Sequence, residues 1–292
     1  MNQNRYQRWY KRKIYQLLDR LYLPLDKDFT HRTQNIRLIP LEPNRKGGKY
    51  AYAEWAHVIG IFQTIIQTQL KNSLDIQILD IGCGTGLVGI ACEPFLGLNG
   101  KYTGIDVIKD DIRFCQNHFP SRNYSFIHLD VANPFYAPTQ QELQAPWPLD
   151  DECMDLVTAL SVWTHFNEND AFYYLNEVAR VLRPGGKAII TFFLLDNKYL
   201  DGLSSRNNQT SAYHKTRKDR WIFDQPAYGS ENWLHPIWAE TPEEAIGITK
   251  AGFKKLNAST CLQHHETYQG NWKEIPGIYF QDIVVFSKPA KI

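Results

Sequence analysis

The sequence is poor in cysteine and has no long apolar run. Its five cysteines are odd in number, scattered, and contain no Cys-x-x-Cys pair, which argues against a disulfide framework and a zinc site. No stretch approaches the roughly 20 apolar residues that a membrane-spanning helix needs, and the basic N-terminus lacks the apolar core of an export signal. We therefore expect a cytoplasmic protein without a metal site or a transmembrane segment.

Charge is nearly balanced over the chain but unevenly distributed. The net charge is +1, and residues 1–50 hold 12 Lys or Arg against 4 Asp or Glu, a balance of +8, which leaves −7 for the remainder. A basic arm of this kind suits contact with phosphates or anionic lipid. The alternative, and the commoner case, is a solvated amphipathic helix that packs on its own domain.

The spacing of apolar residues predicts an α/β domain behind a helical arm. We expect a first helix from Arg5 to Leu23, ended by Pro24, and a second over Tyr50–Leu70. Further strands are expected at 76–82, 101–106, 124–129, 154–161, 186–195, 260–267 and 280–287, and helices near 86–96, 109–118, 168–182 and 241–251. The chain therefore divides into a helical and basic region, 1–72, and a larger domain, 73–292.

Two segments depart from this alternation. Residues 133–149 are rich in Pro and Gln, and residues 196–240 hold many Trp, Tyr and Phe. Loops of this length are uncommon unless they are functional or fold on their own. We interpret 196–240 as an insert that, with the N-terminal helix, forms a lid over the acceptor pocket; a purely structural cap is the alternative.

The most informative segment is Ile78–Gly86, which reads Ile-Leu-Asp-Ile-Gly-Cys-Gly-Thr-Gly. An apolar strand carries a carboxylate, Asp80, and runs into a turn with three alternating glycines. Glycines let the backbone bend sharply and approach a ligand, and a strand–turn–helix junction commonly holds a nucleotide-like cofactor. Asp80 would repel a pyrophosphate but would attract an ammonium group.

The same letters permit a second interpretation. Gly84, Gly86 and Gly89 also spell Gly-x-Gly-x-x-Gly, the dinucleotide fingerprint. Both interpretations need an acidic residue about 20 positions further on for ribose hydroxyls, and Asp106 satisfies both. A nicotinamide-dependent oxidoreductase therefore stays open at this point.

Asp-x-Gly-x-Gly-x-Gly resembles the first motif of class I S-adenosylmethionine (SAM) methyltransferases. The resemblance continues through the strand ending at Asp130 and through Arg-Pro-Gly-Gly at 183–186, and it covers about 76–195 and 241–288. It implies a doubly wound, Rossmann-like, mostly parallel sheet of seven strands in the order 3-2-1-4-5-7-6, with SAM as the cofactor. A narrower similarity, in Ser161-Val-Trp-Thr-His165 among other segments, is to bacterial methyltransferases of glycan pathways.

The resemblance also assigns roles to residues near the strand ends. Those that would hold the methionine moiety are Asp80, Gly82, Cys83, Gly84 and Gly86. Those that would hold the ribose and the adenine are Asp106, Val107, Asp130 and Val131. Leu160 and Ser161 would line the methyl-transfer face, and His165 is the best-placed general base, with a capping or packing role as its alternative.

We expect SAM-dependent methyl transfer to a hydroxyl, or an amine, of a small molecule or glycan precursor. The alternatives are RNA methylation, with the basic arm as a phosphate anchor, and SAM binding without turnover. Nucleobase methylation is less favoured because the segment after the fourth strand lacks Asn-Pro-Pro-Tyr and Pro-Cys.

Overall fold

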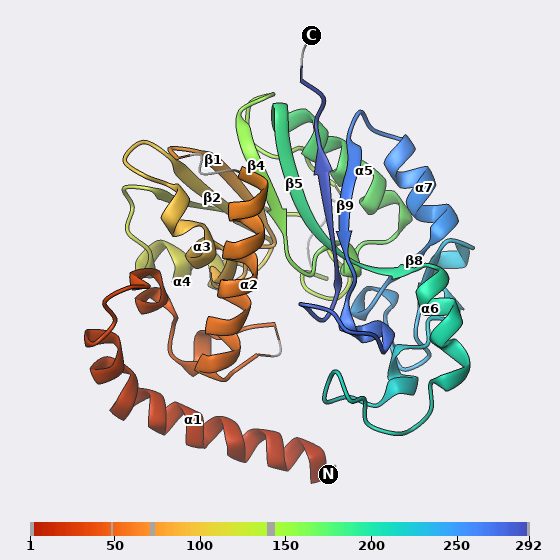
Figure 1. Cartoon of the computed structure of the whole chain (residues 1–292), viewed down its shortest axis with the longest axis horizontal. Coiled ribbons are helices and arrows are strands. Elements are labelled where there is room, and N and C mark those ends of the chain that lie inside the picture. Colours follow the sequence, from red (N-terminus) through yellow and green to blue (C-terminus); the bar gives the residue numbers. More distant parts are fainter. Residues whose placement is uncertain (1–2, 48, 71–73, 139–143, 291–292) are drawn as a thin grey trace.

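A single twisted sheet forms the centre of the structure, a computed structural model that describes residues 3–47, 49–70, 74–138 and 144–290 (Figure 1). Its principal strands are β1 (Gln77–Ile81), β2 (Lys101–Asp106), β3 (Tyr124–His128), β4 (Met154–Ala159), β5 (Leu182–Leu195), β9 (Gln263–Tyr268) and β10 (Asp282–Ser287). They are ordered β3-β2-β1-β4-β5-β10-β9, and only β10 runs antiparallel to its neighbours. The seven predicted strands and their order are confirmed.

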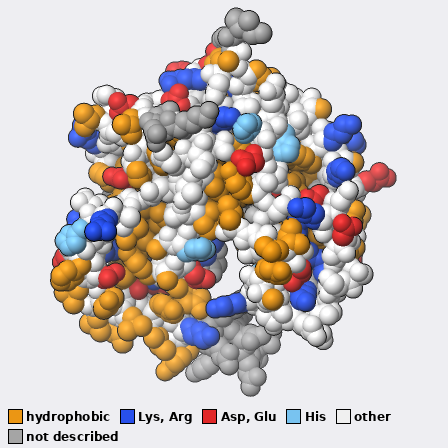
Figure 2. Space-filling view, in the orientation of Figure 1, with side chains coloured by type: hydrophobic (Ala, Val, Ile, Leu, Met, Phe, Trp, Pro, Cys, Tyr) orange, Lys and Arg blue, Asp and Glu red, His pale blue; other side chains and the backbone are white. Residues whose placement is uncertain are grey.

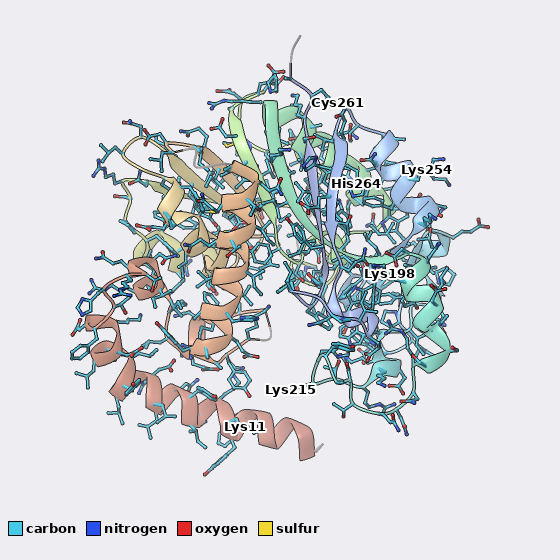
Figure 3. All side chains as sticks on the ribbon, viewed as in Figure 1. Lys11, Lys198, Lys215, Lys254, Cys261 and His264 are labelled. Atoms are coloured by element: carbon cyan, nitrogen blue, oxygen red, sulfur yellow. The ribbon has the colours of Figure 1, made fainter. Side chains whose placement is uncertain are left out.

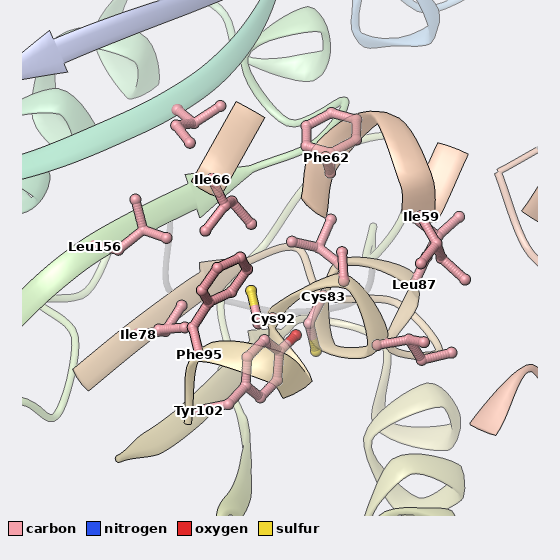
Figure 4. Packing of buried hydrophobic residues seen from close by; sticks show 14 of the residues in the cluster. Ile59, Phe62, Ile66, Ile78, Cys83, Leu87, Cys92, Phe95, Tyr102 and Leu156 are labelled. Carbon is pink, nitrogen blue, oxygen red and sulfur yellow. The ribbon is translucent and has the colours of Figure 1, made fainter. Parts of the chain in front are cut away.

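Helices cover both faces of the sheet because its strands are apolar on both sides. One face packs against α2 (Tyr52–Leu70), α3 (Leu87–Cys92) and α4 (Lys109–His118), and the other against α5 (Glu168–Val181) and α7 (Lys250–Ala258). Leu156 belongs to the first cluster and Val157 to the second, as the two-residue period of a strand requires. Figure 4 shows part of the first cluster, to which Leu156 and Tyr102 of the sheet and Phe62 of α2 belong.

Helix α1 (Gln3–Asp28) is longer than the sequence suggested, and the prediction that Pro24 ends it is wrong. Contacts with the following segment hold the extra turn, because the Lys27 ammonium donates to the Ile39 carbonyl and Arg37 donates to the Lys27 carbonyl. These bonds offset the hydrogen bond that a proline removes. The predicted boundary between 72 and 73 lies outside the described residues.

The helix predicted at 241–251 is also wrong. Thr241 begins a capping box that caps only a single 3₁₀ turn, Pro242–Glu244. Strand β8 (Gly247–Thr249) follows and pairs with residues 193–195 of β5, which extend beyond the ladder with β10. Helix α7 begins only afterwards, capped by a 3.0 Å bond from the Gly252 amide to the Thr249 hydroxyl.

The predicted insert, 196–240, is folded and packed. It contains α6 (Asn197–Gly202), β6 (Gln225–Pro226) and β7 (Trp233–His235), and the two strands continue the sheet from β8. Its aromatic side chains join a cluster with β5 and the segment before β10, and the cluster includes Phe193, Tyr199, Trp221, Phe223, Trp238 and Trp272. None of the insert's residues lines the cavity described below, and the lid role stays a prediction.

Candidate active site

A cavity opens where β1, β2 and β4 end at one edge of the sheet. The carboxyl ends of parallel strands meet at such an edge, which is where ligands bind in open α/β folds. Lys46, Gly47 and Lys49, from the segment between α1 and α2, form one wall. A further wall, after β3, is formed by Leu129, Val131, Ala132, Asn133 and Tyr136.

The turn after β1 has the backbone that its glycines predict. Gly82, Gly84 and Gly86 have φ values of 63°, 50° and 89°, in the left-handed region that L side chains avoid. A Cβ on Gly82 would lie 2.5 Å from the Val162 side chain, and one on Gly86 would lie 2.5 Å from the Phe119 ring. At Gly84 a Cβ would meet no protein atom within 4 Å, so a ligand in the cavity can approach the backbone there.

Asp106 joins the end of β2 to this turn. Its Oδ2 accepts a 2.7 Å bond from the Gly84 amide and its Oδ1 accepts a 2.8 Å bond from the Ile108 amide. Burial raises the pKa of Asp106, and these amide bonds act in the opposite direction. Each carboxylate oxygen retains a lone pair, so the residue holds the turn and can still accept a ligand hydroxyl.

Asp80 is buried beneath the turn. Its Oδ2 accepts from the Tyr102 hydroxyl at 2.5 Å and its Oδ1 accepts from the Thr158 hydroxyl at 2.7 Å. Burial raises the pKa of Asp80 to about 7, although both hydroxyl bonds lower it. A cation in the cavity would stabilise the charged form of this buried carboxylate. The ammonium group expected from the sequence is such a cation.

His165 projects to the cavity from the 3₁₀ turn Trp163–His165, after β4. Its Nδ1 lies 2.6 Å from the Glu243 carbonyl oxygen; because a carbonyl only accepts, Nδ1 carries the proton and Nε2 is the basic nitrogen. Nε2 lies 3.3 Å from the Tyr136 hydroxyl and 3.4 Å from Ser161 Oγ. Burial lowers the pKa of His165, which keeps the ring neutral near pH 7.

Ser161 holds an unusual backbone position beside this histidine. Its φ is 61°, a strained value for a residue other than glycine. The Thr191 hydroxyl accepts from its amide at 2.7 Å, and the Gln281 amide nitrogen donates to its Oγ at 2.9 Å. Bonds from β5 and the start of β10 thus hold Ser161 at the cavity.

Most of the predicted site residues meet at this cavity. Those that line it are Asp80, Gly82, Cys83, Gly84, Asp106, Val107, Val131, Leu160, Ser161 and His165. Gly86 packs instead against Phe119. Asp130 is exposed and lines a neighbouring depression that it shares with Val107 and His128. The structure therefore does not bring Gly86 or Asp130 into the cavity wall.

Several lining residues were missed from the sequence. They are Lys46, Lys49, Trp55, Asn133, Tyr136, Trp147, Asp170 and Tyr174. Trp147 Nε1 is buried and has no hydrogen-bond partner among the described residues, so it is an available donor. The one signal for Asn133, Tyr136 and Trp147 was their position in the irregular segment 133–149.

Comparisons with known proteins agree with this architecture. The profile of the family described as "Methyltransferase domain" matches residues 78–186. The chain is 30% identical over 195 residues to 27-O-demethylrifamycin SV methyltransferase of Amycolatopsis mediterranei, covering 63% of this chain and 67% of that protein. It is 30% identical over 116 residues to the ubiquinone biosynthesis O-methyltransferase of a Bradyrhizobium species, covering 40% of this chain and 39% of that protein.

A solved structure supports the fold. A protein from Pyrococcus horikoshii superposes with a TM-score of 0.52 at 19% identity, over 80% of this chain and 91% of that one. The fold is therefore Rossmann-like, and the matched profile and relatives are methyltransferases. The chain belongs to the family of class I SAM-dependent methyltransferases, and SAM is its cofactor. It spans about two fifths of the length of the first curated relatives that it matches.

The cavity residues fit this cofactor. The amino-acid tail fits beside the open backbone at Gly84 and the buried carboxylate of Asp80. The ribose fits beside Asp106, whose carboxylate oxygens can accept from its hydroxyls. Asp80 also disfavours a pyrophosphate at the turn, which argues against the dinucleotide alternative.

Proposed function

We propose that this chain transfers the methyl group of SAM to a hydroxyl of a small molecule or glycan precursor. The names of two relatives support an oxygen acceptor, since one is a ubiquinone biosynthesis O-methyltransferase and the other acts on 27-O-demethylrifamycin SV.

Residues of the turn and the strand ends would hold the cofactor. Asp80 and the backbone around Gly84 face the amino-acid tail in this proposal, Asp106 accepts from the ribose hydroxyls, and Val107 and Val131 contact the adenine. When bound, SAM supplies an activated methyl group on a sulfonium. The chain itself must then orient the acceptor, exclude water and remove one proton.

The observation that carries the proposal is the fixed tautomer of His165. Because the Glu243 carbonyl holds the proton on Nδ1, Nε2 is an acceptor at the cavity and can take the proton of a hydroxyl as its oxygen is methylated. Tyr136 and Ser161 lie within 3.3 and 3.4 Å of Nε2 and can bind the same acceptor oxygen. An oxygen acceptor needs such a base because a neutral hydroxyl is a weak nucleophile.

RNA is a weaker candidate for the acceptor. The basic N-terminal helix also exposes many large apolar side chains, among them Leu17, Leu21 and Leu25. Phosphate binding is driven by Lys and Arg, and apolar surface contributes nothing to it.

Calorimetry and label transfer together test the proposal. We expect SAM and S-adenosylhomocysteine to bind with micromolar Kd, roughly −8 kcal/mol, and NAD not to bind. Methyl-labelled SAM should then label a small-molecule fraction of the producing cells and not their RNA, and His165→Ala should remove the label without removing SAM binding. Label in RNA would support the alternative acceptor, and tight NAD binding without SAM binding would overturn the proposal.

A further inference from the structure

Helix α1 presents a continuous apolar face to solvent. Its side chains are large and mostly more than half exposed, with Leu21 at 65% and Phe29, just beyond the helix, at 75%. The residues of this apolar face are Tyr10, Ile14, Leu17, Leu18, Leu21, Tyr22, Leu25 and Phe29. Figure 2 shows hydrophobic side chains gathered along the same edge of the molecule, where Figure 1 places α1.

The apolar face points away from the protein. At 100° per residue, the seven of its residues that lie within the helix fall within an arc of about 140°. Asp19 and Leu23, the two buried residues among positions 9–28, lie on the opposite side. There Asp19 pairs with the buried Arg45 at 2.5 Å and Arg12 pairs with Glu42, so the helix is docked through its polar side.

The exposed charge on the helix is predominantly positive. Over residues 9–20 the helix carries Lys11, Arg12, Lys13 and Arg20, and Asp19 in this stretch is buried against Arg45. The last turns carry Lys27 with the acidic residues Asp26 and Asp28. Lys11, labelled in Figure 3, lies within the arc of the apolar face, and Lys13 and Arg20 lie about 40° and about 60° beyond one edge of it.

A basic rim around an exposed apolar stripe matches an anionic lipid surface, where acyl chains accept the apolar side chains and headgroups pair with Lys and Arg. A second copy of α1 is less suitable as the partner of this apolar face, because two helices of the same positive charge would repel each other. Among the described residues no helix is long and apolar enough to cross a membrane, so the helix would lie on the surface.

We infer that α1 binds the protein to the surface of an anionic lipid bilayer through this apolar face. The inference is independent of the methyl-transfer proposal. It does have a consequence for the site: Arg45 pairs with α1, and the neighbouring residues Lys46, Gly47 and Lys49 line the cavity. The anchor and one cavity wall therefore belong to one connected segment.

Vesicle flotation with the full chain tests the inference. Vesicles with about 30% phosphatidylglycerol should bind the protein, and pure phosphatidylcholine vesicles should bind it weakly, because the basic rim needs anionic headgroups. Leu17→Glu with Leu21→Glu should weaken binding at least about tenfold, the scale of one lost buried leucine. Lys13→Gln with Arg20→Gln should weaken binding and reduce its dependence on salt.

The matched control is Leu200→Glu with Ile237→Glu, which adds the same charge at exposed apolar positions of the insert. This control should bind vesicles like the parent chain, and all variants should keep the parent's circular dichroism and SAM affinity. Equal binding to both vesicle types, or no effect of the α1 substitutions, would overturn the inference. Loss of self-association in the α1 variant, with no vesicle binding by the parent, would instead identify a second copy as the occupant.

Discussion

The Tyr102 hydroxyl donates a 2.5 Å hydrogen bond to Oδ2 of Asp80; both residues are buried, and Asp80 lines the cavity. Burial is the main reason why the pKa of Asp80 rises to about 7, and the bonds from Tyr102 and Thr158 only partly offset it. The first carboxylate of the glycine motif is thus poised to titrate near neutral pH. Its charge in the folded protein depends on what occupies the cavity.

The first prediction is that SAM binding strengthens as the pH rises through about 7. The deprotonated Asp80 attracts an ammonium group, whereas the protonated form does not. Calorimetry between pH 5.5 and 8.5, within the range where the fold is retained, should show this rise. Asp80→Asn should bind more weakly at high pH and should lose the pH dependence. A parent profile that is flat across this range would contradict the prediction.

The same pKa has a consequence for the stability of the ligand-free protein. The folded pKa of about 7 lies above the ordinary value of 3.8, so the protonated form favours folding. This contribution is fully present below the unfolded pKa and is lost as the pH rises through about 7. Thermal unfolding should therefore show a smaller loss of Tm with rising pH in Asp80→Asn than in the parent chain.

The second prediction concerns Asp106. Asp106→Ala should weaken SAM binding by about 1.5–3 kcal/mol, the scale of lost hydrogen bonds to a charged group. The turn also loses its bond from the Gly84 amide, so Asp106→Asn is the milder comparison. Asp110→Ala, an exposed carboxylate on α4, is the matched control and should bind SAM normally. Unchanged affinity in Asp106→Ala would remove this residue from the site.

The third prediction separates two glycines of the turn. Gly84→Val should abolish SAM binding because its side chain would occupy open space at the cavity, and the left-handed backbone adds about 1–2 kcal/mol of strain. Gly86→Ala should instead destabilise the fold more strongly, because its Cβ would lie 2.5 Å from the Phe119 ring. Calorimetry and thermal unfolding distinguish the two effects. Equal Tm losses with equal SAM affinities would contradict this division.

The fourth prediction concerns the base. His165→Ala should lower kcat by about 10²–10⁴-fold, the usual contribution of a general base, while SAM affinity stays near the parent value. Burial lowers the pKa of His165, so kcat at saturating SAM should begin to fall only below the ordinary histidine value of about 6.5. The pH dependence that arises from Asp80 affects SAM binding and not kcat. A kcat unaffected by His165→Ala would eliminate the proposed base.

The sequence predicted the parts of this protein that local patterns determine. The strands, their order and the glycine turn follow from apolar runs, backbone demands and a family motif, and the structure confirms the strands and their order. Strand β8 was missed because residues 247–249 have no strand pattern of their own and pair with a free stretch of β5. The extra turn of α1 depends on Lys27 and Arg37, whose contacts are tertiary.

The site residues likewise form two groups, one that the sequence could identify and one that it could not. Residues at strand ends, such as Asp80 and Asp106, could be identified because their position follows from the alternation of strands and helices. Tyr136 and Trp147 could not, because an irregular segment gives no periodicity from which a direction can be inferred. Lys46 and Lys49 reach the cavity only through the docking of α1 and α2, which the sequence does not specify.

The last prediction links the insert to the base. The Tyr228 hydroxyl donates to Glu243 Oε2 at 2.9 Å, and the Glu243 carbonyl accepts from His165 Nδ1 at 2.6 Å. Tyr228 thus acts as a positioning residue, and Tyr228→Phe should lower kcat about fivefold, the scale of one hydrogen bond, without changing SAM affinity. Tyr213→Phe, another exposed tyrosine of the insert, should leave both unchanged. The bond to the Glu243 carbonyl raises the pKa of His165, so a weaker bond in Tyr228→Phe should move the pH at which kcat falls to a lower value. A parent-like kcat and pH profile would show that the insert does not act through Glu243.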